Sequence, residues 1–203
     1  MEKYPERYAM LSDAFRRLVL SVQGIDAGEP DVRELLGIRA ASALLFTMKD
    51  RVCPVYVSDV SISQPPDVSA LADGAGHVLL MLTAGVFADA EGRQLLEIEE
   101  PENSIHPWLL QGFLSALPQP AGSSRILMAA NSPYIVERVS PEVLYIGRTE
   151  SGGPAVFSWI KGSKVRELPG ECRQSGESLG SYIFELLSGS ADGRAILTGY
   201  LED

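Results

Sequence analysis

The chain has 203 residues, of which 45% are hydrophobic and 22% charged, a normal balance for a globular domain with one core. A surface that binds the phosphate backbone of nucleic acids is usually basic, whereas this chain has a net charge of −10. Direct nucleic-acid binding by this chain is therefore not expected. The N-terminus lacks the apolar stretch of a signal peptide, and no segment approaches the roughly 20 apolar residues of a membrane span. The two cysteines, Cys53 and Cys172, have no zinc-ligand spacing. A cytoplasmic protein without a membrane partner is therefore the default expectation.

The N-terminal part is predicted to form a helix and an antiparallel hairpin. Apolar residues recur at steps of three and four over Pro5–Gln23, as on one face of an amphipathic helix. Gly24 is expected to end this helix. Short apolar runs at residues 43–48 and 55–60 surround the charged residues 49–51, which favours a hairpin.

Strands and helices are predicted to alternate in the remainder of the chain. Helices are expected at residues 75–88, 107–117, 134–139 and 179–188 and at the C-terminus, and strands at 94–98, 125–130, 143–147 and 155–160. Pro118, Pro120 and Gly122 are expected to break the chain. The pattern predicts an α/β fold whose mostly parallel sheet is covered by helices on both faces. Because no linker or repeat divides the sequence, residues 1–203 are predicted to be a single domain.

The most informative stretch is an apolar strand that ends in acidic residues and leads through a turn into a helix. It is Leu95-Leu96-Glu97-Ile98-Glu99-Glu100-Pro101-Glu102-Asn103-Ser104-Ile105-His106-Pro107. Phosphoryl transfer to water requires a magnesium ion near the phosphates and a group that orients the water. Carboxylates at the carboxyl end of a buried strand suit both tasks, since ligands bind outside that end of parallel strands. A solvated acidic turn before a helix is the alternative interpretation.

This stretch resembles the Walker B segment of ATP-binding-cassette-like ATPases of the SMC, RecF and overcoming-lysogenisation-defect group. In that group the strand ends in Asp-Glu or Glu-Glu and continues with Pro-Glu-Asn, two residues and His-Pro. The resemblance implies that Glu99 binds Mg²⁺ and that Glu100 is the catalytic base that orients water. It places Asn103 and His106 on a loop that approaches an opposing subunit. It also implies ATP as cofactor and the C-terminal part of a P-loop NTPase fold.

Two flanking segments follow the order of the family's motifs but depart from them in single residues. Ala72-Asp73-Gly74 precedes a long apolar helix and resembles the nucleotide-binding signature Leu-Ser-Asp-Gly, with Ala72 in place of the serine. Asn131 stands where the family has a histidine that senses the γ-phosphate, and its amide can donate a hydrogen bond but carries no charge. Ordinary helix starts are the alternative for both segments.

No Gly-x-x-x-x-Gly-Lys-Ser/Thr sequence occurs in the chain. In the family this P-loop lies far upstream in a separate lobe, so the chain is expected to be inactive unless a P-loop-bearing lobe or subunit joins it. The resemblance implies a homo- or hetero-dimer of such heads, which serve DNA repair, chromosome handling or phage defence. An exposed or unpaired sheet surface is expected where the other lobe is missing. The alternative is a degenerate, non-hydrolysing domain that binds a partner protein, which Ala72 and Asn131 favour.

A second motif, Gly176-Glu177-Ser178-Leu179-Gly180, matches the Gly-x-Ser-x-Gly elbow of α/β-hydrolases. That elbow follows a buried strand, whereas residues 169–175 are polar and are predicted to form a turn. Ser178 is therefore expected to cap the following helix rather than to act as a nucleophile.

Overall fold

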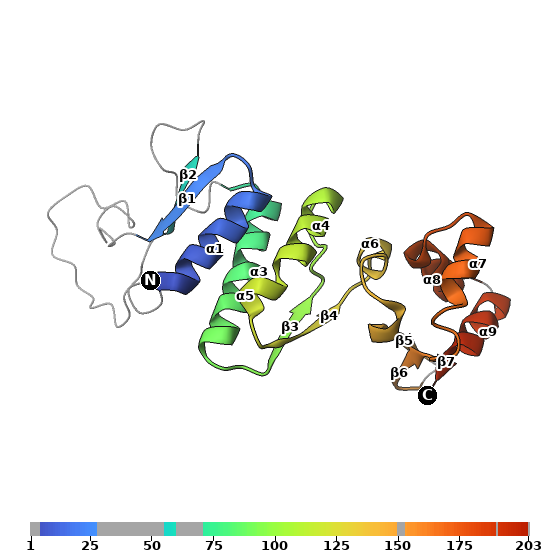
Figure 1. Cartoon of the computed structure of the whole chain (residues 1–203). Helices are drawn as coiled ribbons and strands as arrows, with labels where there is room; N and C mark the ends of the chain where they lie inside the picture. Colours follow the sequence, from blue (N-terminus) through green and yellow to red (C-terminus); the bar gives the residue numbers. More distant parts are fainter. Residues whose placement is uncertain (1–4, 28–54, 60–70, 150–152, 190, 203) are drawn as a thin grey trace, which may run out of the picture. The chain divides into compact units, whose positions relative to one another are not determined.

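The computed structural model describes residues 5–27, 55–59, 71–149, 153–189 and 191–202 (Figure 1). Two compact units divide the chain, Met1–Met128 and Ala129–Asp203. The interpretation of residues 1–203 as one domain stays a prediction. Within the described ranges, every helix is too short or too polar to cross a membrane.

The first unit begins with helix α1 (Pro5–Leu18), followed by strands β1 (Val22–Ala27) and β2 (Val55–Asp59). The predicted helix over Pro5–Gln23 is therefore too long. Its last part forms β1, which pairs antiparallel with β2 and sets Ile25 opposite Val57. Both side chains are buried, because β-branched residues pack well on a pleated surface. The predicted hairpin strand at residues 43–48 lies outside the described residues.

The core of the first unit forms where α1 packs against three further helices. These are α3 (Asp73–Ala90), α4 (Pro107–Ala116) and α5 (Pro118–Ala121). Phe15, Leu82, Phe113 and Leu117 are fully buried among them. The predicted break is present, because α4 ends at Ala116 and Pro118 occupies the first position of the separate short helix α5, where a proline needs no hydrogen-bond donor. The chain reverses only at Gly122, with φ at 56°.

Strands β3 (Leu95–Glu99) and β4 (Arg125–Ala129) pair to form a two-stranded parallel sheet. Leu96 and Ile98 of β3 are buried against the core. Leu95 and Leu127, on the alternate positions, are 54% and 48% exposed. The predicted cover on both faces is therefore wrong for this sheet, whose exposed positions carry these two leucines together with the charged residues Glu97 and Arg125.

The second unit has one antiparallel sheet and several short helices. Its elements are α6 (Pro133–Val136), the 3₁₀ helix η2 (Pro141–Val143), β5 (Tyr145–Thr149), β6 (Ala155–Ile160), α7 (Leu168–Ser175), α8 (Leu179–Ser188), α9 (Ala191–Tyr200) and β7 (Leu201–Glu202). The sheet order is β5-β6-β7, with antiparallel pairing throughout. The described strands of the whole chain thus form three small sheets in a mixed α/β fold, and a mostly parallel sheet is not found among them.

Helix α7 corrects the prediction of a polar turn over residues 169–175. Leu168 and Cys172 lie one helical turn apart and are both buried in the core of this unit, which explains why the segment is helical. Gly176 ends the helix in the left-handed conformation, at φ 78°. The Ser178 hydroxyl then accepts a hydrogen bond from the Ser181 amide at 3.2 Å and caps α8, as predicted. Because α7 precedes Ser178, the hydrolase motif lacks its strand.

Candidate functional site

The two acidic residues of the predicted site lie at the carboxyl end of β3. Glu99 is the last residue of the strand, and both Glu99 and Glu100 are exposed. Glu100 already leaves the strand, with a positive φ of 45°. That conformation costs a residue with a side chain about 1–2 kcal/mol. Pro101 next to it is fully buried and anchors the start of the turn.

The turn after Glu100 is held by two successive backbone hydrogen bonds. The Asn103 amide donates to the Glu100 carbonyl at 2.9 Å, and the Ile105 amide donates to the Glu102 carbonyl at 3.2 Å. Ser104, near the end of the turn, also has a positive φ, at 60°. Two non-glycine residues in this conformation within five positions form a strained segment, and such strain is concentrated at functional sites.

The turn packs directly against the N-terminus of α3. A Cβ atom at Gly74 would lie 2.6 Å from the Ser104 carbonyl oxygen, so only glycine allows this approach. One helical turn further, the His77 Nδ1 atom lies 2.9 Å from the Asn103 carbonyl oxygen. The structure therefore brings the predicted signature residue Gly74 against the turn that carries the predicted loop residue Asn103.

His77 was not among the predicted site residues. It follows Asp73 by four positions on α3, and residues at that spacing share one face of a helix. This spacing is the signal by which the sequence could have indicated it. Its ring contacts the backbone of the turn, which is a positioning contact.

The two remaining predicted residues near α3 and α4 are helix caps. Ala72 is the N-cap of α3 and makes no side-chain cap hydrogen bond, since it has no hydroxyl. His106 is the N-cap of α4, and its Nδ1 atom accepts a hydrogen bond from the Trp108 amide at 3.4 Å.

Asn131 belongs to the second unit, where it lies exposed between β4 and α6. The next residue, Ser132, is buried and is the N-cap of α6, although its side chain makes no cap hydrogen bond. Asn131 is thus on the loop after the strand, the position that the sequence predicted for it.

Within the described ranges, no group of three or more His, Cys, Asp or Glu side chains could hold a metal ion by itself. Mg²⁺ seldom requires such a cage, because it is usually bound by one or two carboxylates together with water and phosphate oxygens. Glu99 and Glu100 provide carboxylates of this kind in an accessible place. Their carboxylate oxygens are of the donor type that Mg²⁺ accepts.

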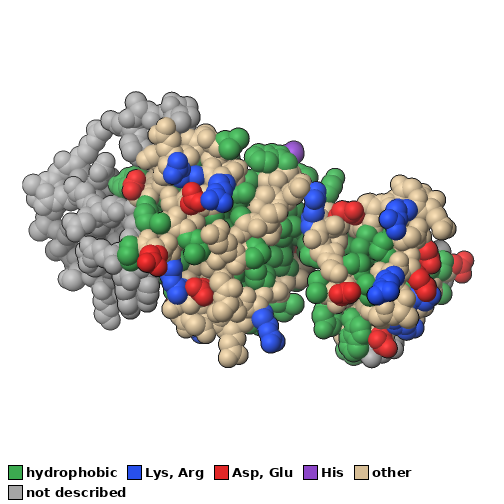
Figure 2. Space-filling model, in the orientation of Figure 1, with side chains coloured by type: hydrophobic (Ala, Val, Ile, Leu, Met, Phe, Trp, Pro, Cys, Tyr) green, Lys and Arg blue, Asp and Glu red, His purple; other side chains and the backbone are tan. Residues whose placement is uncertain are grey.

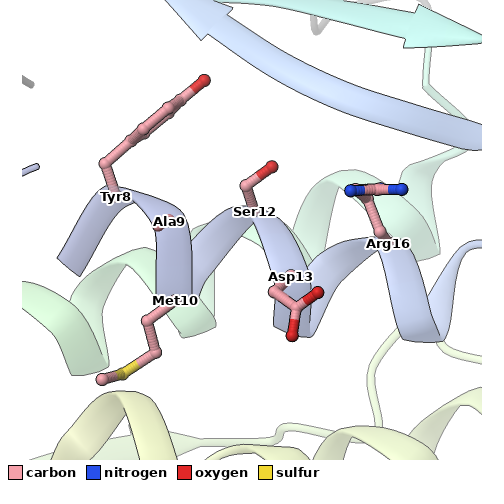
Figure 3. Close-up of a pocket in the computed structure, with 6 residues that line it drawn as sticks. All are labelled: Tyr8, Ala9, Met10, Ser12, Asp13 and Arg16. Atoms are coloured by element: carbon pink, nitrogen blue, oxygen red, sulfur yellow. The ribbon is translucent and has the colours of Figure 1, made fainter. Parts of the chain in front are cut away.

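Among the described residues of the first unit, concave surfaces also lie apart from Glu99 and Glu100. A shallow pocket of about 500 Å³ lies on α1, and Figure 3 shows that its six lining residues all come from that one helix. An apolar groove of about 550 Å³ is lined by α1, α3, Ile25 and Val55. None of the predicted site residues lines either of them.

Comparison with solved structures identifies a protein whose fold is similar over most of this chain. No protein-family model matches the sequence, and no curated protein matches it. A solved chain from work on the structural biochemistry of ATP-driven dimerization and DNA-stimulated activation of SMC ATPases matches with a TM-score of 0.54. The match covers 85% of this chain and 94% of that chain, at 7% sequence identity. The chain therefore has an SMC ATPase-like fold.

Proposed function

We propose that the chain is the C-terminal, Walker B-bearing lobe of an ABC- or SMC-like ATPase head. The observation that carries the proposal is the Glu99–Glu100 pair at the end of β3, followed by a strained turn that packs on the N-terminus of α3. The SMC ATPase-like fold supports it. A P-loop-bearing lobe or subunit would supply the remaining half of the nucleotide site.

In this proposal each acidic residue has its own task. Glu99 would hold Mg²⁺, which neutralises charge on the β- and γ-phosphates of ATP when it is bound. Glu100 would accept a hydrogen bond from the attacking water and orient it. The contacts of Gly74 with Ser104 and of His77 with Asn103 would keep the signature segment and the turn in one arrangement.

The signature segment and Asn131 would meet phosphate rather than metal. Backbone amides at the start of α3 and the positive end of its dipole favour an anion near Asp73 and Gly74. Asn131 would donate a hydrogen bond through its amide in place of the family's histidine. Asn103 and His106 would face a second head in a homo- or hetero-dimer. The open face with Leu95 and Leu127 supports the docking of a further lobe on the β3–β4 sheet.

The experiment measures phosphate release by the complex of this chain with its P-loop-bearing partner. Glu100→Gln keeps the shape of the side chain and removes its charge, so ATP binding should persist while turnover falls by about 10²–10⁴-fold. Glu99→Gln should instead weaken the binding of Mg²⁺, so that turnover requires a higher magnesium concentration. Glu91→Gln is the matched control, because Glu91 is an exposed acid whose ion pair with Arg93 is of the weak surface kind.

The assignment of Glu100 is wrong if the complex hydrolyses ATP and Glu100→Gln stays within about twofold of the parent. The second candidate function is that of a non-hydrolysing domain that binds a partner protein. The uncapped start of α3 at Ala72 favours it, since the serine hydroxyl of the family's signature is missing there. A complex that assembles stably but releases no phosphate would establish this alternative.

A further inference from the structure

The β5–β6 pair of the second unit exposes three aromatic rings on one face. Tyr145, Phe157 and Trp159 are 64%, 66% and 41% exposed. The register places Tyr145 directly opposite Trp159, so these two side chains share a face, and Phe157 lies on the same face two residues before Trp159. Figure 2 shows hydrophobic side chains gathered at the β5–β6 end of this unit. We refer to Tyr145, Phe157 and Trp159 as the aromatic face.

The rings of the aromatic face are held in place by neighbouring groups. Tyr145 and Trp159 make an edge contact, with ring centroids 6.3 Å apart and planes at 70°. The Trp159 indole donates a hydrogen bond to a Glu202 carboxylate oxygen at 3.1 Å. The Phe157 ring lies over Gly147, where a Cβ atom would be 3.0 Å from it. A ligand would therefore meet preorganised rings, which lowers the entropic cost of binding.

One edge of the same sheet is open. Among the residues that the structure describes, β5 pairs with β6 on one side and with no strand on the other. An open edge offers backbone donors and acceptors to an added strand. A long side chain of such a strand, placed beside Gly147, would reach the Phe157 ring, because Gly147 has no side chain to block it.

Area and charge together distinguish the kinds of partner. With roughly 200 Å² for each aromatic side chain, the three exposed fractions sum to about 340 Å². This area is less than half of the ~800 Å² that each partner buries in a stable dimer interface. It is, however, within the range of apolar surface patches that bind other molecules. Two exposed acidic residues are close by: Glu202 accepts the hydrogen bond from Trp159, and Glu142 lies on η2, three residues before Tyr145. A second copy of the chain would bring these like charges together, whereas a basic segment would complement them.

We propose that the aromatic face and the open edge of β5 bind an extended, basic segment of another protein, which adds to the sheet as a strand. Alternate lysine or arginine side chains of that segment lie over the rings, where cation–π attraction adds to the pairing with Glu142 and Glu202. The intervening side chains point to the other face of the sheet and are apolar. The inference is independent of ATP hydrolysis and of the Glu99–Glu100 pair.

The test uses the full chain carrying Trp108→Phe, which leaves Trp159 as the only tryptophan. The probe is an eight-residue peptide that alternates valine and lysine, titrated while the fluorescence of Trp159 is recorded. We expect a saturable change in that fluorescence. In competition against a labelled copy of the peptide, the double variant Tyr145→Thr/Phe157→Thr should bind at least tenfold more weakly, because exposed aromatic anchors carry most of the energy of small interfaces.

Two controls distinguish binding at the aromatic face from non-specific binding of the peptide. Tyr134→Thr removes an aromatic side chain that is 61% exposed on α6 and should leave peptide affinity unchanged. A peptide in which glutamate replaces lysine should not bind. The proposal is overturned if the basic peptide gives no saturable change, if the acidic peptide binds equally, or if the double variant keeps its affinity. It is also overturned if sedimentation shows a dimer of the chain that Tyr145→Thr/Phe157→Thr abolishes, since the occupant is then a second copy.

Discussion

The contact between Gly74 and the turn after β3 can be tested by comparing two glycines of the same helix. A Cβ atom at Gly74 would lie 2.6 Å from the Ser104 carbonyl oxygen, and that oxygen belongs to the backbone. A Cβ atom at Gly76 would have nothing within 4 Å. Both residues lie in α3, so the sequence context of an alanine substitution is closely matched.

The two substitutions are expected to have opposite effects on the free energy of unfolding. Alanine stabilises a helix by about 0.5–1 kcal/mol relative to glycine, so Gly76→Ala should raise stability by about that amount. At Gly74 the added methyl group must push α3 away from the turn, and overpacking of this kind costs about 1–3 kcal/mol. Gly74→Ala should therefore unfold with a free energy about 1–3 kcal/mol lower than that of Gly76→Ala.

Urea unfolding of the full chain, followed by Trp108 fluorescence, measures this difference. The variants are compared in a Trp159→Phe background, because Trp159 belongs to the second unit and would report the unfolding of that unit instead. The fluorescence then comes from Trp108 alone and follows the first unit. Equal slopes of free energy against urea would indicate that the two variants expose the same surface. If Gly74→Ala is as stabilising as Gly76→Ala, the close packing of the turn on α3 is refuted, and with it the joined arrangement of signature and turn.

Three further outcomes are expected. Calorimetry on the isolated chain should detect no tight binding of magnesium-ATP, because the P-loop contacts are absent from its sequence; tight binding would contradict this. In a Cys53→Ser background, Cys172 should react with a thiol reagent only as its unit unfolds, since it is 3% exposed and burial raises the pKa of its thiol; labelling of the native chain at the rate of a free thiol would count against it. A side-chain hydrogen bond with Glu185, and then burial, raise the pKa of Glu177, so its contribution to stability is present at low pH and is lost as pH rises through that raised pKa. Glu177→Gln should accordingly lose less stability than the parent between about pH 4 and pH 7. If the variant and the parent show the same dependence of stability on pH, Glu177 and Glu185 do not share a proton in the folded chain.

The elements that the sequence predicts well are those with a long apolar pattern or a strong boundary signal. Helices α3 and α8 and strands β3, β4 and β6 lie within a residue or two of their predicted positions. Proline at the start of α4 and serine at the start of α8 mark boundaries through local hydrogen bonding, which needs no knowledge of the rest of the fold.

Other elements depend on partners that are distant in sequence. The residues of β1 continue the helical periodicity of α1, and only pairing with β2, about thirty residues later, makes them a strand. Helix α7 has few apolar residues, and it is the burial of Leu168 and Cys172 against α8 and α9 that fixes it. In both cases tertiary packing overrides the local pattern. The arrangement of strands into three small sheets has the same origin, since strand pairing is not encoded in single-strand periodicity.

For the candidate site, the sequence predicts which residues lie at the end of β3 but not how the backbone presents them. Alternation along a strand would direct the side chains of Glu99 and Glu100 to opposite faces. The strand ends at Glu99, however, and Glu100 has a φ of 45°, so the left-handed backbone and the buried Pro101 determine where its carboxylate points. A solvated acidic turn has no need of such a conformation, because glycine or asparagine would adopt it at lower cost. Glutamate at this position is thus held in a costly conformation by the packed turn, and the catalytic role proposed for its carboxylate would account for that cost.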